Sequence, residues 1–292
     1  MNRKNYSSQT KIFSFLILFA LASNLSSDIE DNIALHKEQF SEVALKIWEY
    51  AELGYQETKS SNLLASELEK EGFKITKRVA GIPTAFVAEF GSSGPVIGIL
   101  GEFDALPGLA QTNSPFKEVA INDSGGGHAC GHHLFGAASA WAAVSIKEWL
   151  VENDIEGTVR FYGTPAEEGG SGKVYMVREG LFDDVDVVLH WHPDDVNSAN
   201  PKTSNSNKSA KFTFKGISAH AAGSPELGRS ALDGVEAMNM MVNLMREHIP
   251  QESRMHYVIT KGGLAPNVVP DLAEVYYYVR HPEMKVVEEL FQ

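Results

Sequence analysis

Cysteine is almost absent from this sequence, since only Cys130 occurs among its 292 residues. One cysteine has no partner for an intramolecular disulfide, so a disulfide-stapled fold is excluded and the thiol needs another explanation. Positive charge is also scarce, because 25 Lys and Arg residues face 38 Asp and Glu residues, giving a formal net charge of −13. Nucleic acids and anionic lipids are bound through Lys and Arg, so we expect neither as a partner and favour a small molecule or peptide.

Long apolar runs are missing as well, and the run at residues 12–22 is too short to span a bilayer. It follows a basic segment without acids and ends in Ala20-Leu21-Ala22, a small-x-small spacing that signal peptidases accept. We therefore predict a signal peptide at residues 1–22, export to the periplasm or the exterior, and no membrane segment in the mature form. An uncleaved N-terminus would instead tether the protein to a membrane, and a buried helix of the mature fold is the remaining alternative.

Helical and extended patterns alternate along the first two thirds of the chain. Apolar residues recur at three- and four-residue steps over residues 29–51 and 60–71, and an Ala-rich segment at 133–151 predicts a third helix. Short β-rich apolar runs at 84–90, 96–100, 158–162 and 185–189 predict strands. Strands that alternate with helices predict an α/β domain built on a mainly parallel sheet.

A polar, aperiodic stretch at residues 198–209 predicts a linker. Beyond it we predict a strand at 211–215, a helix at 230–248, strands at 257–260 and 274–280, and a second helix from Glu283. This β-α-β-β-α order is that of a ferredoxin-like split fold without its last strand. We therefore expect a first domain at residues 28–205 and an incomplete second domain at 208–292.

Polar clusters follow the predicted strands of the first domain. The sequence GEFDALP follows the strand at 96–100, PAEE follows the strand at 158–162, HWHP follows the strand at 185–189, and HACGHH precedes the Ala-rich helix. Ligands of open parallel sheets bind beyond the carboxyl ends of the strands, so the candidate site lies at this edge.

Cys130 and His132 flank Gly131, a spacing that can aim a thiolate and an imidazole at one point if a helix begins between them. Thiolate, imidazole and carboxylate together suit zinc or a related divalent ion. A buried thiol beside histidines that pack or cap is an equally good explanation of this motif alone.

Glu167 and Glu168 are adjacent and therefore point in different directions, so one can bind metal while the other acts as a general base. An acidic first turn of a helix is the alternative, because the helix dipole favours acids there. The following GGSGK segment does not have the glycine spacing of a phosphate-binding loop, and we reject that interpretation.

Six motifs together resemble one family: GEFDALPG, HACGHH, TPAEEGG, LHWHP, GISAHAAGSPELGRSALDGVEAMN and GGLAPNVVPDLAEVYYYVR. In this order, from about Ile33 to the last residue, they are similar to the metal-dependent aminoacylase and carboxypeptidase G group of peptidases, in its amidohydrolase branch. The resemblance implies an α/β, zinc-peptidase-like catalytic domain interrupted by a ferredoxin-like α+β dimerisation domain. It also implies a homodimer or hetero-oligomer formed through that inserted domain.

The resemblance further implies a cofactor of two divalent metal ions, zinc or manganese, and a set of ligands for them. Those ligands map to Cys130, His132, Glu168 and His192, with His190 as a weaker candidate. The family needs one more histidine ligand after the inserted domain closes, and the given sequence ends before that point. We therefore expect an incomplete metal site in the chain as given.

The remaining roles also come from the resemblance. Glu167 matches the general base, and Asp104 matches the aspartate that supports the metal ligands from behind. His220 matches a histidine that reaches a partner subunit's site and stabilises the oxyanion, with Asn267 nearby in the same role or in substrate binding. Arg280 matches a position that holds the substrate carboxylate through its planar guanidinium. From the residues alone, His220 is equally a surface histidine and Arg280 a solvent-facing one.

The implied reaction is hydrolysis of the amide bond of an N-acyl or N-aroyl amino acid, such as aminobenzoyl-glutamate, or of a peptide. Two alternatives stay open on the sequence. One is a dipeptidase or N-acetyl amino acid deacylase of the same fold. The other is a truncated homologue that binds its ligand or a partner subunit without turnover.

Overall fold

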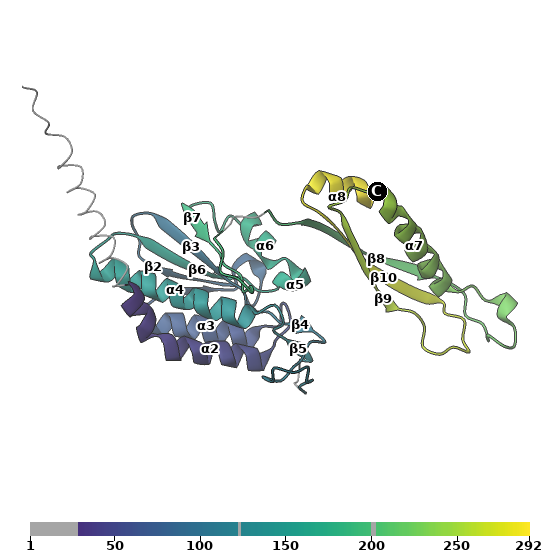
Figure 1. Ribbon diagram of the computed structural model, residues 1–292, viewed down its shortest axis with the longest axis horizontal. Coiled ribbons are helices and arrows are strands. Elements are labelled where there is room, and N and C mark those ends of the chain that lie inside the picture. Colours follow the sequence, from purple (N-terminus) through teal and green to yellow (C-terminus); the bar gives the residue numbers. More distant parts are fainter. Residues whose placement is uncertain (1–28, 122–123, 200–202) are drawn as a thin grey trace, which may run out of the picture. The chain divides into compact units, whose positions relative to one another are not determined.

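The computed structural model describes residues 29–121, 124–199 and 203–292 (Figure 1). The chain forms two compact units that meet in sequence between Val196 and Asn197. The predicted signal peptide at residues 1–22 lies outside the described residues. No helix within the described ranges is both long enough and apolar enough to cross a membrane.

The first unit is built on a five-stranded sheet. Its strands are β1 (Lys74–Lys77), β2 (Phe86–Phe90), β3 (Val96–Gly101), β6 (Thr158–Gly163) and β7 (Val187–Leu189), in the order β1-β2-β6-β3-β7. Strand β3 is parallel to β6 and β7, whereas β2 is antiparallel to β1 and β6. Four strands therefore run in one direction and only β2 opposes them, which confirms the predicted mainly parallel sheet.

Strand β1 was not among the predicted strands. Its sequence, KITK, has one apolar residue, and most of its positions are exposed, so it carries no periodic signal. Antiparallel pairing of all four of its residues with β2 makes it a strand. Strand β1 lies at the edge of the sheet, where a strand needs no hydrophobic pattern of its own. Its pairing therefore depends on the position of β2 in the folded protein.

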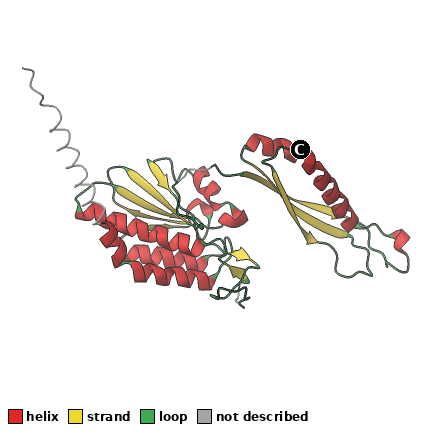
Figure 2. Ribbon diagram, viewed as in Figure 1, coloured by secondary structure: helices red, strands yellow, loops and turns green. Residues whose placement is uncertain are grey.

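Three helices cover one face of this sheet: α2 (Lys37–Tyr50), α3 (Thr58–Lys70) and α4 (His132–Glu152) (Figure 2). Their apolar stripes form the main core with alternate strand residues, including Ile99 and Phe161. The next residue of each strand, Leu100 or Tyr162, points to the other face, where it packs near Met176 of α6 (Gly172–Arg178). The helix predicted from residue 29 is interrupted by a turn at His36 before α2 begins.

The carboxyl ends of the parallel strands lie level with one another. Gly101 at the end of β3 pairs with Gly163 at the end of β6, and Ile99 pairs with Leu189 at the end of β7. Beyond these ends lie the two-residue strands β4 (Leu106–Pro107) and β5 (Gly126–Gly127), and the short irregular helix α5 (Glu167–Gly170). The polar clusters therefore leave the sheet at one edge, as predicted.

The second unit contains β8 (Ser206–Lys215), α7 (Ala231–Met245), β9 (Arg254–Lys261), β10 (Leu272–His281) and α8 (Met284–Phe291). Its sheet has the order β8-β10-β9 with antiparallel pairs, and α7 and α8 pack on the face that carries Val275, Tyr277 and Val279. The predicted β-α-β-β-α order is confirmed. The described ranges also contain short 3₁₀ turns, η1 (Val79–Gly81) in the first unit and η2 (Pro225–Leu227) and η3 (Arg246–His248) in the second.

The predicted linker at residues 198–209 was wrong in its second part. Strand β8 begins at Ser206 and pairs with β10 as far as His281, with every second residue less exposed than its neighbours. The small polar residues at the start of β8 show no apolar alternation, so the sequence did not predict a strand there. Pairing with β10 extends the strand over them.

One carboxylate lies in the core of the first unit. Glu57, at the start of α3, is fully buried; its carboxylate accepts hydrogen bonds from the Thr84 hydroxyl at 2.9 Å and the Ala166 amide at 2.8 Å. Burial is the largest influence on this group and raises its pKa to about 7, although the hydrogen bonds oppose the shift. The folded protein therefore keeps a proton on Glu57 at a pH where the unfolded chain has lost it.

We expect Glu57→Gln to stabilise the protein relative to wild type as the pH rises. The folded pKa lies above the unfolded value of 4.5, so the stability contributed by protonated Glu57 is complete below pH 4.5 and is lost as the pH rises through 7. The difference in unfolding free energy between variant and wild type should shift by on the order of 3 kcal/mol between pH 5 and pH 8. Urea denaturation of the metal-free protein at each pH measures it, with Glu69→Gln, exposed on the same helix, as the control for charge loss. A difference that stays flat with pH would contradict this account of Glu57.

Candidate metal centre

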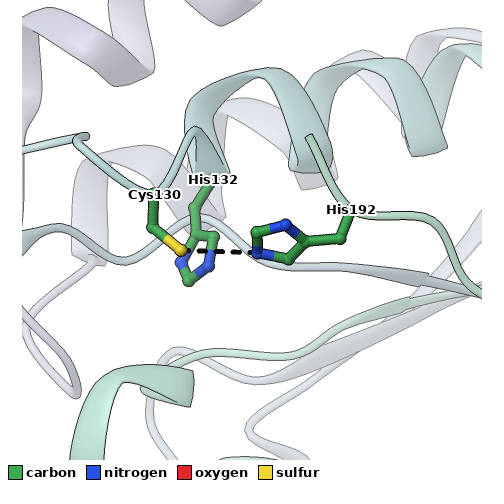
Figure 3. Close-up of side chains that lie close together, drawn as sticks. All are labelled: Cys130, His132 and His192. Carbon is green, nitrogen blue, oxygen red and sulfur yellow. Dashed lines mark hydrogen bonds between the residues drawn. The ribbon is translucent and has the colours of Figure 1, made fainter. Parts of the chain in front are cut away.

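Three side chains from separate segments meet at the edge where the parallel strands end. Cys130 lies in the loop before α4, His132 is the first residue of α4, and His192 follows β7 (Figure 3). Their ligand atoms all lie within 4.8 Å of one another, and Cys130 Sγ is 3.4 Å from His192 Nε2. Two imidazoles and a thiol, drawn from positions 62 residues apart, form a donor set suited to zinc or a similar divalent ion.

Hydrogen bonds at Nδ1 direct the Nε2 atoms of His132 and His192 toward the site. His132 Nδ1 lies 3.0 Å from a carboxylate oxygen of Asp104 and 3.1 Å from the Asp104 carbonyl, and both are acceptors. His192 Nδ1 lies 2.9 Å from the carbonyl of Pro193. Because a carbonyl or carboxylate can only accept, Nδ1 must carry the proton in both rings. Such a hydrogen bond on the remote nitrogen is how metal-binding histidines are oriented.

The adjoining segment fixes His192 in place. The indole nitrogen of Trp191 donates to the Ser139 hydroxyl of α4 at 3.1 Å, and its ring packs edge-on against Phe135. The rings of His190 and His192 both contact Phe135, at 5.0 and 6.0 Å, but His190 is absent from the cluster of ligand atoms in the described structure. Of the two histidines proposed from the sequence, His192 is the one that the structure directs at Cys130.

Acidic side chains complete the site on its other side. A second group of potential ligands joins His132 to Glu102 and Glu167, again with all ligand atoms within 4.8 Å. The amide of Glu168 donates to Asp104 at 2.9 Å, so one carboxylate aligns both the His132 ring and the glutamate turn. Asp104 itself is almost completely buried. The structure thus brings together the five first-unit ligands and acids predicted from the sequence, namely Cys130, His132, Glu167, Glu168 and His192, and Asp104 contacts two of them, His132 and Glu168.

Glu102 was not assigned a role from the sequence. It is 3% exposed and forms an ion pair with Lys173, the lysine of the rejected phosphate-loop motif. Burial would raise its pKa, but contact with His132 and the charge of Lys173 outweigh burial and lower the pKa to about 2. The available signal was its position, one residue past the end of β3 and two before Asp104.

The described atoms fit a bound cation. Nε2 of His132 and Oε2 of Glu102 are buried and face each other at 3.0 Å, and within the described part of the chain neither has a further polar partner. Buried polar atoms need polar partners, and a metal ion bound by both would satisfy them together with the other donors of the site. The thiol, imidazole and carboxylate donors facing this point match the ligand preferences of zinc or manganese.

The negative charge of the site also favours a bound cation. Burial, followed by the negative charges of Glu168, Glu167 and Glu102, raises the pKa of Cys130 to about 12. Burial lowers the pKa of His132, but contacts with Asp104 and Glu102 outweigh it and raise this pKa to about 10. Both shifts share a cause, which is the concentration of negative charge around these two side chains. A divalent ion would displace a proton from each of them.

The remaining histidines of the HACGHH motif have structural roles. His128 Nε2 donates to the carbonyl of Ile47 at 3.0 Å, and the ring of His133 lies 5.2 Å from that of His128. Burial lowers the pKa of both to about 4, so both are neutral. A third group of possible ligands consists of His36, Glu71 and Glu148. His36 forms a 2.8 Å pair with Glu148 of α4, so we interpret this group as a structural contact and not as a metal site.

Two of the three second-unit candidates lie side by side. The backbone at His220 bridges Val268, and the Ala221 amide donates to the Asn267 carbonyl at 3.0 Å. His220 Nδ1 accepts from the amides of Ala222 and Gly223 at 3.2 and 3.0 Å, so its exposed Nε2 carries the proton as a donor.

Arg280 lies near the other end of β10 from this loop. It is eight residues past Leu272, a span of about 26 Å at roughly 3.3 Å per residue. Its guanidinium stacks over the Tyr278 ring at 5.1 Å. Within the second unit, therefore, Arg280 does not join His220 and Asn267.

Gly131 allows the turn that aims Cys130 and His132 at one point. Its φ is +78°, and a Cβ there would lie 2.9 Å from two atoms of the Pro193 ring. We expect Gly131→Ala to strain the turn by roughly 1–2 kcal/mol and to displace the His192 segment, lowering zinc affinity about 10-fold or more. Gly72→Ala is the control, because Gly72 also has a positive φ but no described atom within 4 Å of an added Cβ. Equal zinc affinities in the two variants, measured by calorimetry, would contradict this prediction.

Comparison with known proteins shows which family shares this sequence. A model of peptidase family M20/M25/M40 matches residues 98–279, which include most of the candidate site and most of the second unit. A crystal structure of a dinuclear metal-binding peptidase of this family from Bacillus subtilis is similar, with a TM-score of 0.56 and 25% identity over 88% of this chain and 67% of that one.

Two curated relatives resemble the chain over most of its length. One subunit of the p-aminobenzoyl-glutamate hydrolase of Escherichia coli K12 is 47% identical over 264 residues, which are 90% of this chain and 55% of that protein. The Xaa-Arg dipeptidase of Mus musculus is 32% identical over 266 residues, 87% of this chain and 57% of that protein. The chain therefore spans somewhat more than half the length of these relatives.

Proposed function

Because the chain belongs to peptidase family M20/M25/M40, we propose that it acts as a metal-dependent amidohydrolase. The proposed substrates are N-acyl or N-aroyl amino acids such as aminobenzoyl-glutamate. The observation that carries the proposal is the convergence of Cys130, His132 and His192 beside Glu167 and Glu168 at the carboxyl edge of the sheet. The identity of 47% with a p-aminobenzoyl-glutamate hydrolase subunit supports the substrate class.

The proposed cofactor is a pair of divalent ions, zinc or manganese, held by Cys130, His132, Glu168 and His192. When bound, these ions supply Lewis-acid activation of the attacking water and of the amide carbonyl. Asp104 holds the His132 ring and the Glu168 backbone in register, which keeps both donors aimed at one point.

In the proposed reaction Glu167 moves the proton. Desolvation by the surrounding loops, followed by the charges of Glu102 and Glu168, raises the pKa of Glu167. A carboxylate with a raised pKa accepts a proton from water and returns it to the leaving amine more readily than an ordinary glutamate. The exposure of Glu167 gives water access to it.

We assign the second-unit candidates to substrate recognition. His220 presents an Nε2–H donor that suits a developing oxyanion, and Asn267 lies beside it for the same role or for substrate binding. Arg280 offers a guanidinium for the substrate carboxylate, already oriented by stacking on Tyr278. The second unit is proposed as the inserted oligomerisation domain.

Oligomerisation through this unit is supported by an apolar strip on α7. Met240, Met241 and Leu244 are each about two thirds exposed. Large exposed apolar groups grouped on one helix are typical of interfaces. Sedimentation of the protein, with Met241→Lys as the test variant, should show a dimer or larger assembly that dissociates in the variant; a wild-type monomer would reject the proposal.

A hydrolysis assay tests the proposed function. The protein, expressed from its complete reading frame, should release p-aminobenzoate and glutamate from p-aminobenzoyl-glutamate when zinc or manganese is supplied, and lose this activity with a chelator. A dipeptidase is the second candidate, favoured by the 32% identity with an Xaa-Arg dipeptidase, and Ala-Arg in a parallel assay separates the two. If metal binds but neither substrate is hydrolysed, the hydrolase proposal fails and the non-catalytic alternative gains support.

We also propose export by a signal peptide that is cleaved after Ala22. The basic segment and apolar run before that point support it. N-terminal sequencing of the mature protein should begin at Ser23, and retention of Met1 would favour the membrane-tethered alternative.

A further inference from the structure

The segment between α2 and α3 runs along the back of the candidate site. At its beginning the carbonyl of Glu52 accepts the Ala105 amide at 2.8 Å, and Leu53 forms a parallel bridge to Ala105. The segment is therefore tied to the loop that carries Asp104. The segment, residues 52–57 (ELGYQE), had no role predicted from the amino-acid sequence.

The turn that carries both catalytic glutamates lacks the regular geometry of a helix. Ala166, which precedes it, has a left-handed conformation with φ 55° and ψ 44° although it is not glycine. Glu168 has ψ 79° and Gly169 has φ 82°, so two of the four residues of α5 depart from helical values. A four-residue segment of this kind is not stabilised by its own hydrogen bonds, so groups outside it must fix its shape.

Both ends of this turn are bound by the ELGYQE segment. At the entry, the buried carboxylate of Glu57 accepts the amide of Ala166 at 2.8 Å, across 109 positions of sequence. At the exit, the hydroxyl of Tyr55 donates to the carbonyl of Gly170 at 2.6 Å. The Thr84 hydroxyl holds the other oxygen of Glu57, so the carboxylate cannot rotate away.

Close packing reinforces these two hydrogen bonds. A Cβ added at Gly170 would lie 2.6 Å from Ala166 Cβ and 2.8 Å from the Tyr55 ring, and a Cβ at Gly54 would lie 3.1 Å from Ala166 Cβ. The turn is thus folded directly onto the ELGYQE segment, and no larger side chains fit between them.

We propose that Glu57 and Tyr55 are positioning residues that hold the two ends of the Glu167–Gly170 turn and thereby aim the carboxylates of Glu167 and Glu168. This inference deepens the proposed function and rests on it for the chemical roles of those carboxylates. The described side-chain hydrogen bonds of the two residues go to Gly170, Ala166 and Thr84 and to none of the candidate ligands, so each acts through the turn. Loss of either anchor should change the direction of the carboxylates without removing them.

The decisive variant is Tyr55→Phe, which deletes a single hydroxyl from a side chain that is 39% exposed and therefore should not unfold the protein. Two kinds of measurement are needed, the affinity for zinc and manganese by calorimetry, and kcat and KM for p-aminobenzoyl-glutamate. We expect metal affinity or kcat to fall about 10-fold, at the low end of the effects of residues that orient metal ligands, with KM changed less than kcat. Tyr50→Phe, at the end of α2, is the matched control and should behave as wild type.

Variants of Glu57 provide a second, independent test. Glu57→Gln keeps an oxygen for the Ala166 amide and should retain metal affinity, whereas Glu57→Ala should lower it about 10- to 100-fold. If Glu57→Ala fails to fold, Tyr55→Phe still decides the matter. Wild-type metal affinity and kcat in Tyr55→Phe would overturn the proposal. If the wild-type protein hydrolyses none of the substrates, the proposed function fails, and metal affinity alone decides whether these residues position the site.

Discussion

Replacing Glu167 with glutamine should abolish turnover while the protein keeps its bound metal. Glutamine preserves the size of the side chain and one carbonyl oxygen, but it cannot take a proton from water at any working pH. General-base catalysis of this kind contributes about 10²- to 10⁴-fold to rate, so kcat should fall by that factor. Stopped assays with p-aminobenzoyl-glutamate measure kcat, and elemental analysis after gel filtration measures metal per chain.

The matched variant is Glu168→Gln, which tests whether Glu167 is the general base and Glu168 the metal ligand. The structure groups Glu167 with Glu102 and His132 by distance, while Glu168 acts on the Cys130 thiol through its negative charge. If Glu168 is the ligand, its replacement should reduce metal content as well as activity. The reverse pattern, in which Glu167→Gln loses metal and Glu168→Gln loses only turnover, would exchange the two roles. Retained turnover in Glu167→Gln would refute its role as the base.

The second large effect is the loss of zinc affinity expected when one histidine of each of two neighbouring pairs is replaced. His132→Ala should lower zinc affinity by more than about 100-fold, because loss of a ligand exceeds the effect of losing a residue that merely orients one. His133→Gln should leave affinity unchanged, since the ring of His133 packs against His128 and takes no part in the groups of ligand atoms described. In the same way, His192→Ala should lose zinc and His190→Ala should keep it, because only His192 of the two joins Cys130 and His132 in the cluster of ligand atoms within the described residues.

Calorimetric titration with zinc measures these four variants under identical conditions. Equal losses within a pair would mean that local unfolding, and not removal of a ligand, causes the effect. Zinc affinity that survives in both His132→Ala and His192→Ala would remove the central argument for a metal centre at this edge of the sheet.

Much of the fold could be predicted from periodicity. The Ala-rich helix was predicted at 133–151 and is found as α4 (His132–Glu152), and the strand predicted at 96–100 is β3 (Val96–Gly101). These elements are recognisable because they are rich in apolar residues that become buried, in β3 on both faces of the sheet. Strand β1 and the first residues of β8 lack such patterns, and they are strands because neighbouring backbones pair with them.

The candidate site was predictable in its donor types and only partly in its geometry. Carboxylates, imidazoles and a thiol after parallel strands pointed to a metal site, since the ends of parallel strands meet at one edge. The sequence did not distinguish His192 from His190 by position alone, and it gave no role to Glu102, Tyr55 or Glu57. Those distinctions depend on contacts across large sequence separations, such as the 115 positions between Tyr55 and Gly170.

The sequence by itself determined the two-unit α/β organisation, the edge of the sheet where the chemistry lies, and the family to which the six motifs point. Only the tertiary structure decided which nitrogen of His132 and His192 faces the site, and that a buried glutamate and a tyrosine hold the glutamate turn. The physical reason is the range of the interactions. Helix and strand preferences act within a few residues and are written in local patterns. The tautomer of a histidine and the shape of an irregular turn are fixed by hydrogen bonds from segments that only folding brings together.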